Sequence, residues 1–327
     1  MILVTGGAGF VGSNVVAALT ERGVPVAVCD RLRQDDKWRN LAKVPLRELI
    51  APEALLEWLP ARASQIDVVI HMGAISATTE RDADLIAEVN FRLSQALWRW
   101  CARSGKRFIY ASSAATYGDG AQGFDDDGAP QALARLRPLN AYGWSKHLFD
   151  RWVAHGPEVG EARPSQWVGL KFFNVYGPNE YHKGGMRSVV AQKYPLAAAH
   201  RPVTLFRSYR PDVPDGGQKR DFVYVRDCVE VVLWLLEHPQ VNGLFNLGTG
   251  TARSFEELAR ALCAALDRPA QLEFVDMPPA VRAHYQYRTE ARIGRLRAAG
   301  YSQAFTSLEE GVREYVQRYL SQSDPYR

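Results

Sequence analysis

The sequence predicts an α/β fold in which a doubly wound parallel sheet is followed by a smaller C-terminal domain. Short apolar runs at residues 2–5, 67–71 and 108–111 have the length and residue types of strands buried on both faces. Stretches with helical character separate these runs, and a glycine-rich loop follows the first one directly. Strands that alternate with helices form parallel sheets, and ligands bind such sheets at the carboxyl ends of the strands.

The composition is that of a globular protein with ample length for a buried core. Its 327 residues are 46% hydrophobic and 23% charged, and the net charge of +4 is spread along the chain. Because no basic block or aromatic-basic stripe is present, we expect no nucleic-acid partner. The four cysteines lack metal-ligand or disulfide spacing, which predicts no metal site and fits the cytoplasm. No apolar run is long enough for a signal peptide or a membrane span, so we expect a cytoplasmic protein without a membrane partner.

The glycine-rich loop predicts a dinucleotide site. Its glycines stand between the strand at 2–5 and a helix expected over about 13–22. This spacing lets the backbone approach a pyrophosphate, and the helix N-terminus adds N–H groups and a partial positive charge. A second strand at 24–29 ends at Asp30, where a side chain can read the adenosine ribose. The residues expected nearest the cofactor in this Rossmann arrangement are Gly6, Gly9, Phe10, Val11 and Gly12.

Two signals compete over the form of the dinucleotide. Asp30 suits the free 2′-hydroxyl of NAD, whereas Arg31, Arg33 and Lys37 suit the 2′-phosphate of NADP. We favour NADP because several cations follow the single acid. NAD remains the alternative, since these cations could also be solvated loop charges.

Two further strands bring polar residues to the same edge of the sheet. The strand at 67–71 leads into a turn expected to pass close to the cofactor, and the helix at 84–101 carries Asn90, either a polar contact or an exposed helical residue. The strand from 108 ends at Ser113, which either hydrogen-bonds a reacting oxygen or caps a turn. The turn residues are Met72, Gly73, Ala74, Ile75 and Ser76.

Tyr142 and Lys146 are the candidate catalytic pair. Four residues are close to one helical turn, so the phenol and the ammonium share a helix face. A tyrosine loses its proton near pH ~10, and lowering that pKa to ~7 needs roughly 4 kcal/mol of stabilisation by neighbouring cations. Such a phenolate can remove the proton of an alcohol while hydride leaves the same carbon.

Taken together, these motifs resemble the extended short-chain dehydrogenase/reductase family. The glycine loop, the 67–74 strand and turn, Ser113, and Tyr142 with Lys146 occur in that family's order. Residues 110–118 and 140–150 are similar to the ADP-heptose 6-epimerases within it. The resemblance implies inversion at C6″ of an ADP-heptose for lipopolysaccharide core assembly, through transient oxidation by bound NADP. It also implies a homo-oligomer, with a pentamer as the expected assembly. The alternatives are another nucleotide-sugar 4-epimerase or 4,6-dehydratase, or a catalytically silent nucleotide sensor.

The resemblance assigns roles in the second half of the chain as well. It implies that Val175 contacts the cofactor, that Lys146 holds the cofactor ribose, and that Lys183 contacts the cofactor and acts as a second acid/base opposite Tyr142. Guanidinium binds phosphate in a planar fork, so Arg220 is the candidate diphosphate clamp; the alternative is an ion pair with Asp221 or Asp227. The other implied substrate contacts are Ser113, Asn174, Gly185, Gln192, Phe206, Arg207, Ser208, Tyr209 and Tyr285.

This chain departs from the family pattern at a few of these places, namely Pro52, Met72, Val89, Gly185 and Gln192. We expect residues 1–170, with return segments at about 220–250, to form the cofactor domain. Residues 171–327 are expected to form mainly the substrate domain.

Overall fold

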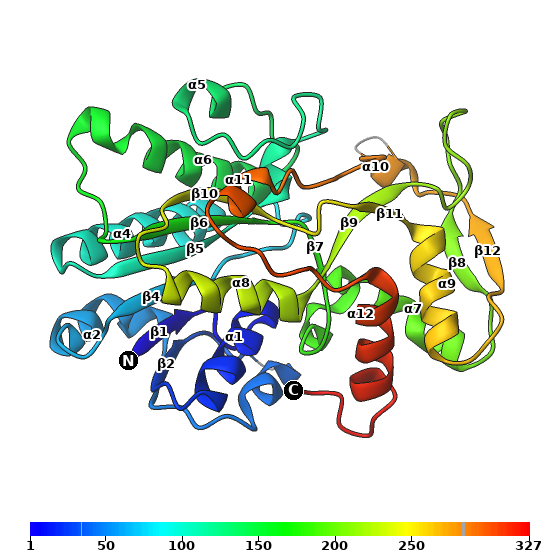
Figure 1. Cartoon of the computed structure of the whole chain (residues 1–327), viewed down its shortest axis with the longest axis horizontal. Helices are drawn as coiled ribbons and strands as arrows, with labels where there is room; N and C mark the ends of the chain where they lie inside the picture. Colours follow the sequence, from blue (N-terminus) through cyan, green and yellow to red (C-terminus); the bar gives the residue numbers. More distant parts are fainter. Residues whose placement is uncertain (34, 283–284) are drawn as a thin grey trace.

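The computed structural model describes residues 1–33, 35–282 and 285–327, and its centre is a parallel sheet (Figure 1). Within these ranges seven strands pair in the order β10-β6-β5-β4-β1-β2-β3. The order reverses between β1 and β4, and ligands bind such sheets at this reversal. The predicted doubly wound sheet is therefore confirmed. Its strands are β1 (Ile2–Thr5), β2 (Val26–Cys29), β3 (Glu48–Ile50), β4 (Val68–His71), β5 (Arg107–Ser113), β6 (Trp167–Phe172) and β10 (Gly243–Leu247).

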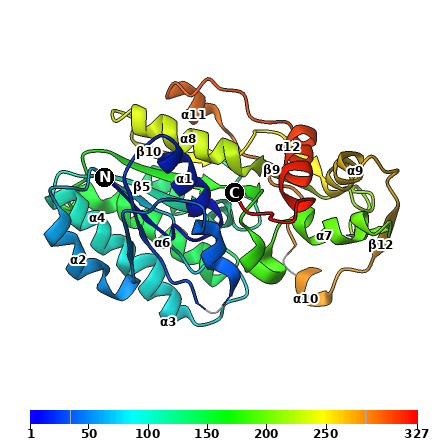
Figure 2. The ribbon, with the colours of Figure 1, turned by 90° about the horizontal axis from the view of Figure 1, so that it is seen from below.

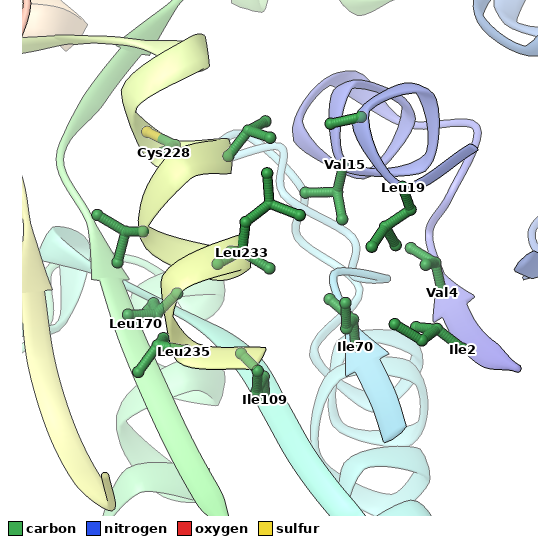
Figure 3. Close-up of a cluster of buried hydrophobic side chains, with 14 of the residues drawn as sticks. Ile2, Val4, Val15, Leu19, Ile70, Ile109, Leu170, Cys228, Leu233 and Leu235 are labelled. Atoms are coloured by element: carbon green, nitrogen blue, oxygen red, sulfur yellow. The ribbon is translucent and has the colours of Figure 1, made fainter. Parts of the chain in front are cut away.

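Helices cover both faces of this sheet, and each strand contributes alternate side chains to the two sides. In β1, Ile2 and Val4 belong to the cluster under α1 (Phe10–Glu21) and α8 (Val225–Glu237), while Leu3 belongs to the cluster on the other face. Figure 3 shows the first cluster, in which strand side chains meet Leu19 of α1 and Leu233 of α8. The opposite face is covered by α2 (Leu55–Arg62), α4 (Leu93–Arg103) and α6 (Ala141–His155).

A smaller lobe is attached beyond the carboxyl edge of the sheet (Figures 1 and 2). In the described part of the chain it holds a three-stranded sheet, β11-β9-β7, and a pair, β12-β8. A third apolar cluster joins these strands to their helices. The elements are β7 (Asn174–Tyr176), β8 (Val203–Phe206), β9 (Lys219–Tyr224), β11 (Ala252–Ser254), β12 (Leu272–Val275), α7 (Val189–Ala198), α9 (Phe255–Ala265) and α12 (Leu308–Tyr315).

The remaining helical pieces are short. The helix predicted over 84–101 is present as an unbroken helical run over 83–103, in which residues 87–92 form a π-helical turn. No helix within the described ranges is long and apolar enough to cross a bilayer. The short helices are α3 (Ala83–Ile86), α5 (Pro130–Leu133), α10 (Pro279–Arg282) and α11 (Gly294–Ala298).

The chain passes between the two lobes abruptly. β6 ends at Phe172 and β7 begins at Asn174, so Phe173 alone separates a strand of the large sheet from a strand of the small one. Of the return segments expected at about 220–250, α8 and β10 lie on the large sheet, whereas β9 pairs with β7 in the small sheet.

Candidate active site

A cavity of about 460 Å³ opens where the two lobes meet at the carboxyl ends of β1, β4 and β5. The glycine-rich loop and the turn after β4 form one wall, and α6 with the end of β5 forms another. The segment from the end of β6 to the start of α7 supplies the third. This is the position at which doubly wound sheets bind their ligands.

The glycine-rich loop has the shape of a pyrophosphate cradle. A Cβ atom added to Gly12 would lie 2.1 Å from the Gly6 carbonyl oxygen, and one added to Gly6 would lie 2.5 Å from Gly73. Gly6 also has a positive φ of 66°, which favours glycine. Helix α1 begins at Phe10, earlier than predicted, because extended Gly9 serves as its N-cap. Its first backbone N–H groups therefore face the cavity, as a dinucleotide pyrophosphate requires.

Asp30 and Lys37 stand together where the adenosine ribose is expected. Asp30 accepts hydrogen bonds from the N–H groups of Ala8 (2.9 Å) and Arg31 (2.7 Å), and its Oδ1 lies 2.6 Å from Lys37 Nζ. Both side chains line the cavity. The guanidinium of Arg31 instead pairs with Glu53 at the surface, and Arg33 is exposed. Of the predicted cations, Lys37 is thus the one that reaches the cavity.

Tyr142 and Lys146 project from α6 into the cavity one turn apart. Burial raises the pKa of Tyr142 above its ordinary value, opposed by a hydrogen bond with Ser113, and the Asp150 carboxylate raises it further. Burial therefore opposes the phenolate, and lowering this pKa towards ~7 still needs neighbouring cations. Burial lowers the pKa of Lys146 to about 8, against the opposing effect of Asp150. Its ammonium makes no hydrogen bond to the described residues, which leaves it free for a ligand.

Ser113 lies at the carboxyl end of β5 and caps a turn, which is one of its two predicted roles; a hydrogen bond to a reacting oxygen stays a prediction. Its Oγ accepts a hydrogen bond from the Ala115 N–H (3.1 Å), capping a short 3-10 helix, and its side chain also lines the cavity near Tyr142.

Asn90 is a buried brace, so the alternative of an exposed helical residue is wrong. Its Oδ1 accepts from the Ile75 N–H (2.8 Å), and its Nδ2 donates to the Ile75 carbonyl (2.9 Å) and to Ser145 Oγ (3.0 Å). It therefore ties the turn after β4 to α6. Ile75 does not line the cavity, whereas the other predicted turn residues Met72, Gly73, Ala74 and Ser76 do.

A fully buried ion pair joins α6 to β6. Asp150 Oδ2 is 2.6 Å from Lys171 Nζ on β6, and neither side chain is exposed. Asp150 also accepts hydrogen bonds from Ser112 (2.7 Å) and Tyr110 (3.0 Å) on β5. The ion pair thus ties α6 to β6, and the two hydroxyl donors tie α6 to β5, the strand that ends in Ser113. Sequence reasoning missed it, although a lysine inside an apolar strand was a usable signal.

Lys183 enters the cavity from the segment between β7 and α7. Its ammonium lies 5.3 Å from the centre of the Phe10 ring, and burial lowers its pKa, opposed by the Glu180 carboxylate. The chain continues through Gly184 at a φ of 53°, a left-handed conformation suited to glycine. Asn174 and Val175 line the same wall, as do His182 and Arg187, which sequence reasoning did not single out as site residues.

A family model described as the NAD dependent epimerase/dehydratase family matches residues 2–248. The chain belongs to this family. It is 50% identical over 332 residues to an ADP-L-glycero-D-manno-heptose-6-epimerase of Nitratidesulfovibrio vulgaris, with full coverage of both proteins.

Two solved epimerases are similar to the chain over nearly its whole length. The heptose epimerase of Helicobacter pylori is 29% identical, with a TM-score of 0.79 and coverage of 97% and 95%. The UDP-glucose 4-epimerase of Thermus thermophilus, solved with NAD, is 28% identical, with a TM-score of 0.73 and coverage of 96% and 97%. The predicted resemblance is thus confirmed, and a NAD-type cofactor is a property of this epimerase/dehydratase family.

Several of the substrate contacts that the family resemblance implies are not among the residues that line the cavity. Gln192 donates to the carbonyls of Gly185 (3.1 Å) and Arg187 (2.6 Å), so its amide braces the Lys183 segment. Ser208 and Tyr209 lie on the loop after β8, held by Asp215 (2.7 Å) and Asp276 (3.2 Å). Arg207 is exposed beside them.

Arg220 sits between aromatic rings rather than beside a carboxylate. Its guanidinium lies 5.0 Å from the Tyr285 ring and 5.5 Å from the Phe255 ring, and Phe255 lines the cavity. Tyr285 in turn meets Phe206 edge to face, with centroids 6.4 Å apart. Asp221 accepts instead from the backbone at 249, 250 and 291, and Asp227 from the backbone and side chain at 306. The alternative of an Arg220 ion pair with either acid is therefore wrong.

Proposed function

We propose that this protein inverts C6″ of ADP-D-glycero-D-manno-heptose to give ADP-L-glycero-D-manno-heptose. The observation that carries the proposal is that two candidate proton carriers, Tyr142 and Lys183, enter one cavity from different walls. Tyr142 comes from α6 beside the end of β5, whereas Lys183 comes from the small-lobe side next to Phe10. Inversion at a carbon needs a proton carrier for each orientation of its oxygen.

The residues divide the chemistry between them. A bound nicotinamide dinucleotide supplies reversible hydride transfer. Ser113 orients the C6″ oxygen, Tyr142 exchanges the proton of that oxygen in one orientation, and Lys183 exchanges it in the other. Between the two exchanges the sugar ketone presents its opposite face, which inverts the carbon. The cation of Lys146 holds the cofactor ribose and favours the Tyr142 phenolate when the site is filled.

NADP is the proposed form of the cofactor. The Lys37 ammonium lines the cavity and pairs with Asp30, which also accepts hydrogen bonds from the backbone N–H groups of Ala8 and Arg31. An ammonium at this position suits a 2′-phosphate better than a free hydroxyl. Native mass spectrometry of the purified protein, followed by identification of the released nucleotide, tests this directly. Recovery of NAD would contradict it.

The ADP group has a candidate site next to the cavity. Arg220, held between Tyr285 and Phe255 without a carboxylate partner among the described residues, is the proposed diphosphate clamp.

We further propose that residues 1–170, with return segments near 220–250, form the cofactor lobe and that residues 171–327 form mainly the substrate lobe. The proposed assembly is a cytoplasmic homo-oligomer, a pentamer, that acts in lipopolysaccharide core assembly.

The test is conversion of one purified ADP-heptose epimer into the other, followed by NMR. Tyr142→Phe and Lys183→Met should each lower the rate by about a hundredfold or more, the usual loss of a general acid/base. No net reduced cofactor should accumulate, because the reaction is redox-neutral. UDP- and GDP-sugars serve as controls, and faster epimerisation of one of them at C4 would move the assignment to a sister activity. Full conversion by both variants would exclude these two residues as the proton carriers.

A further inference from the structure

Each of the residues 178–182, which directly precede Lys183, is held by contacts with distant parts of the chain. The Pro178 carbonyl accepts from Asn14 of α1 (3.0 Å), and the Asn179 carbonyl accepts from Asn40 (3.0 Å). Further bonds run from Asn179 Nδ2 to Ser13 Oγ (3.0 Å), from Tyr315 of α12 to Glu180 (3.0 Å), and between His182 and Asn40 (3.2 Å). Lys183 itself makes no hydrogen bond from its ammonium to the described residues.

Residues 325–327 complete this anchoring. The Tyr181 hydroxyl donates to the Pro325 carbonyl (2.8 Å), and the Tyr181 and Tyr326 rings meet edge to face with centroids 5.1 Å apart. The Arg327 N–H donates to Asn179 Oδ1 (3.0 Å). Three contacts thus join this short tail to the two residues at 179 and 181.

Residues 325–327 also contact the cofactor lobe. The Arg39 guanidinium lies 4.6 Å from the Tyr326 ring, and Lys43 donates to the Tyr326 carbonyl (2.7 Å). Arg327 pairs with Glu21 of α1 (2.9 Å). Tyr326 is 7% exposed. In both ribbon views the end marked C lies beside α1 (Figures 1 and 2).

We propose that residues 325–327 form a latch that positions Lys183. The latch bridges the cofactor lobe and residues 179–181, and so holds the backbone from which Lys183 reaches the cavity. A lysine has a long flexible stem, so its ammonium is placed only as well as its backbone is fixed. A misplacement of about 1 Å can lower a rate about a hundredfold, so an anchor remote from the reacting carbon matters. This inference rests on the acid/base role proposed for Lys183.

The test variant is Tyr326→Ala, with Tyr326→Phe as its matched control. The Tyr326 hydroxyl makes no hydrogen bond to the described residues, whereas its ring touches both Tyr181 and Arg39. Alanine removes the ring contacts, and phenylalanine keeps them. A chain ending at Asp324 is the second variant, and thermal melting checks that each protein folds.

Hydrogen–deuterium exchange gives a readout that does not depend on activity. Tyr326→Ala and the shortened chain should exchange faster in peptides covering residues 178–188, while peptides from β5 and β6 stay unchanged. Tyr326→Phe should match the parent protein. Unchanged exchange at 178–188 in both test variants, or a rise spread over the whole chain, would overturn the latch.

Transient absorbance of reduced cofactor in the holoenzyme, measured with each ADP-heptose epimer separately, gives the second readout. Lys183→Met identifies the epimer whose oxidation needs Lys183. Tyr326→Ala should slow that same epimer by about tenfold and the other by less than about twofold, because a shift of the Lys183 backbone leaves Tyr142 in place. Equal slowing of both epimers, or of neither, would overturn the proposal.

If Lys183→Met slows neither epimer, the acid/base role of Lys183 is wrong and the latch has no catalytic group to position. The exchange experiment then still decides whether residues 325–327 hold the 178–188 segment.

Discussion

Replacing Lys171 with methionine should destabilise the protein by about 3 kcal/mol, at the lower end of the ~3–5 kcal/mol typical when one partner of a buried ion pair is removed. The lysine and Asp150 have no exposed side-chain surface, so water cannot take over the lost contact. Ser112 and Tyr110 still donate to the carboxylate, which is why we expect the smaller loss. Methionine conserves most of the buried volume, so the change isolates the charge.

The assay is urea unfolding at neutral pH, followed by tryptophan fluorescence, for the two single variants and the double variant. Asp150→Asn keeps acceptors for Ser112 and Tyr110 but removes the negative charge. The double variant Lys171→Met/Asp150→Asn should lose less free energy of unfolding than the two single losses added together, by at least about 1 kcal/mol, because contacting groups couple. Strictly additive losses, or a loss below about 0.5 kcal/mol for Lys171→Met, the range of an ordinary surface change, would refute the reasoning.

The other predictions concern the cavity itself. Lys146→Met should abolish epimerisation yet raise the melting temperature at neutral pH, because a pKa lowered from 10.5 to about 8 means that burying the ammonium costs about 3 kcal/mol. The folded pKa is the lower one, so this cost is complete below pH 8 and vanishes as the pH approaches 10.5; an equal gain at high pH would contradict the assignment. Gly12→Ala should yield folded protein without bound nucleotide, seen as a lower 260 nm absorbance, since its Cβ would lie 2.1 Å from the Gly6 carbonyl oxygen. Arg220→Met should weaken ADP binding by about tenfold or more in calorimetry, and Arg220→Lys should not restore it, because an ammonium offers no planar fork. Unchanged ADP affinity in both would remove Arg220 from the diphosphate site.

The elements that the sequence predicted well carry local signals. Apolar runs marked the central strands, and glycine spacing marked the cradle, because both depend on the conformation of a few adjacent residues. The start of α1 was misplaced by three residues because Gly9 is itself the N-cap. Helix α7 was missed because Pro195 lies within it, a residue that ordinarily interrupts a helix.

The features that were missed depend on contacts between distant parts of the chain. Asn90 was assigned to the cofactor or to solvent, yet it braces Ile75 and Ser145, which lie 15 and 55 residues away. The burial of the Tyr142 phenol, which raises its pKa, likewise depends on the folded chain and does not follow from the spacing to Lys146.

The single residue between β6 and β7 has a consequence for how this enzyme scaffold can be altered. The Phe173 N–H donates to the Leu247 carbonyl (3.0 Å), so the last ladder bond of the large sheet and the first pair of the small sheet, Asn174 with Phe222, are consecutive. An insertion or deletion here would turn each following side chain of β7 to the opposite face. Changes in loop length are therefore better placed at residues 207–217, between β8 and β9, while the β6–β7 junction is kept at its present length.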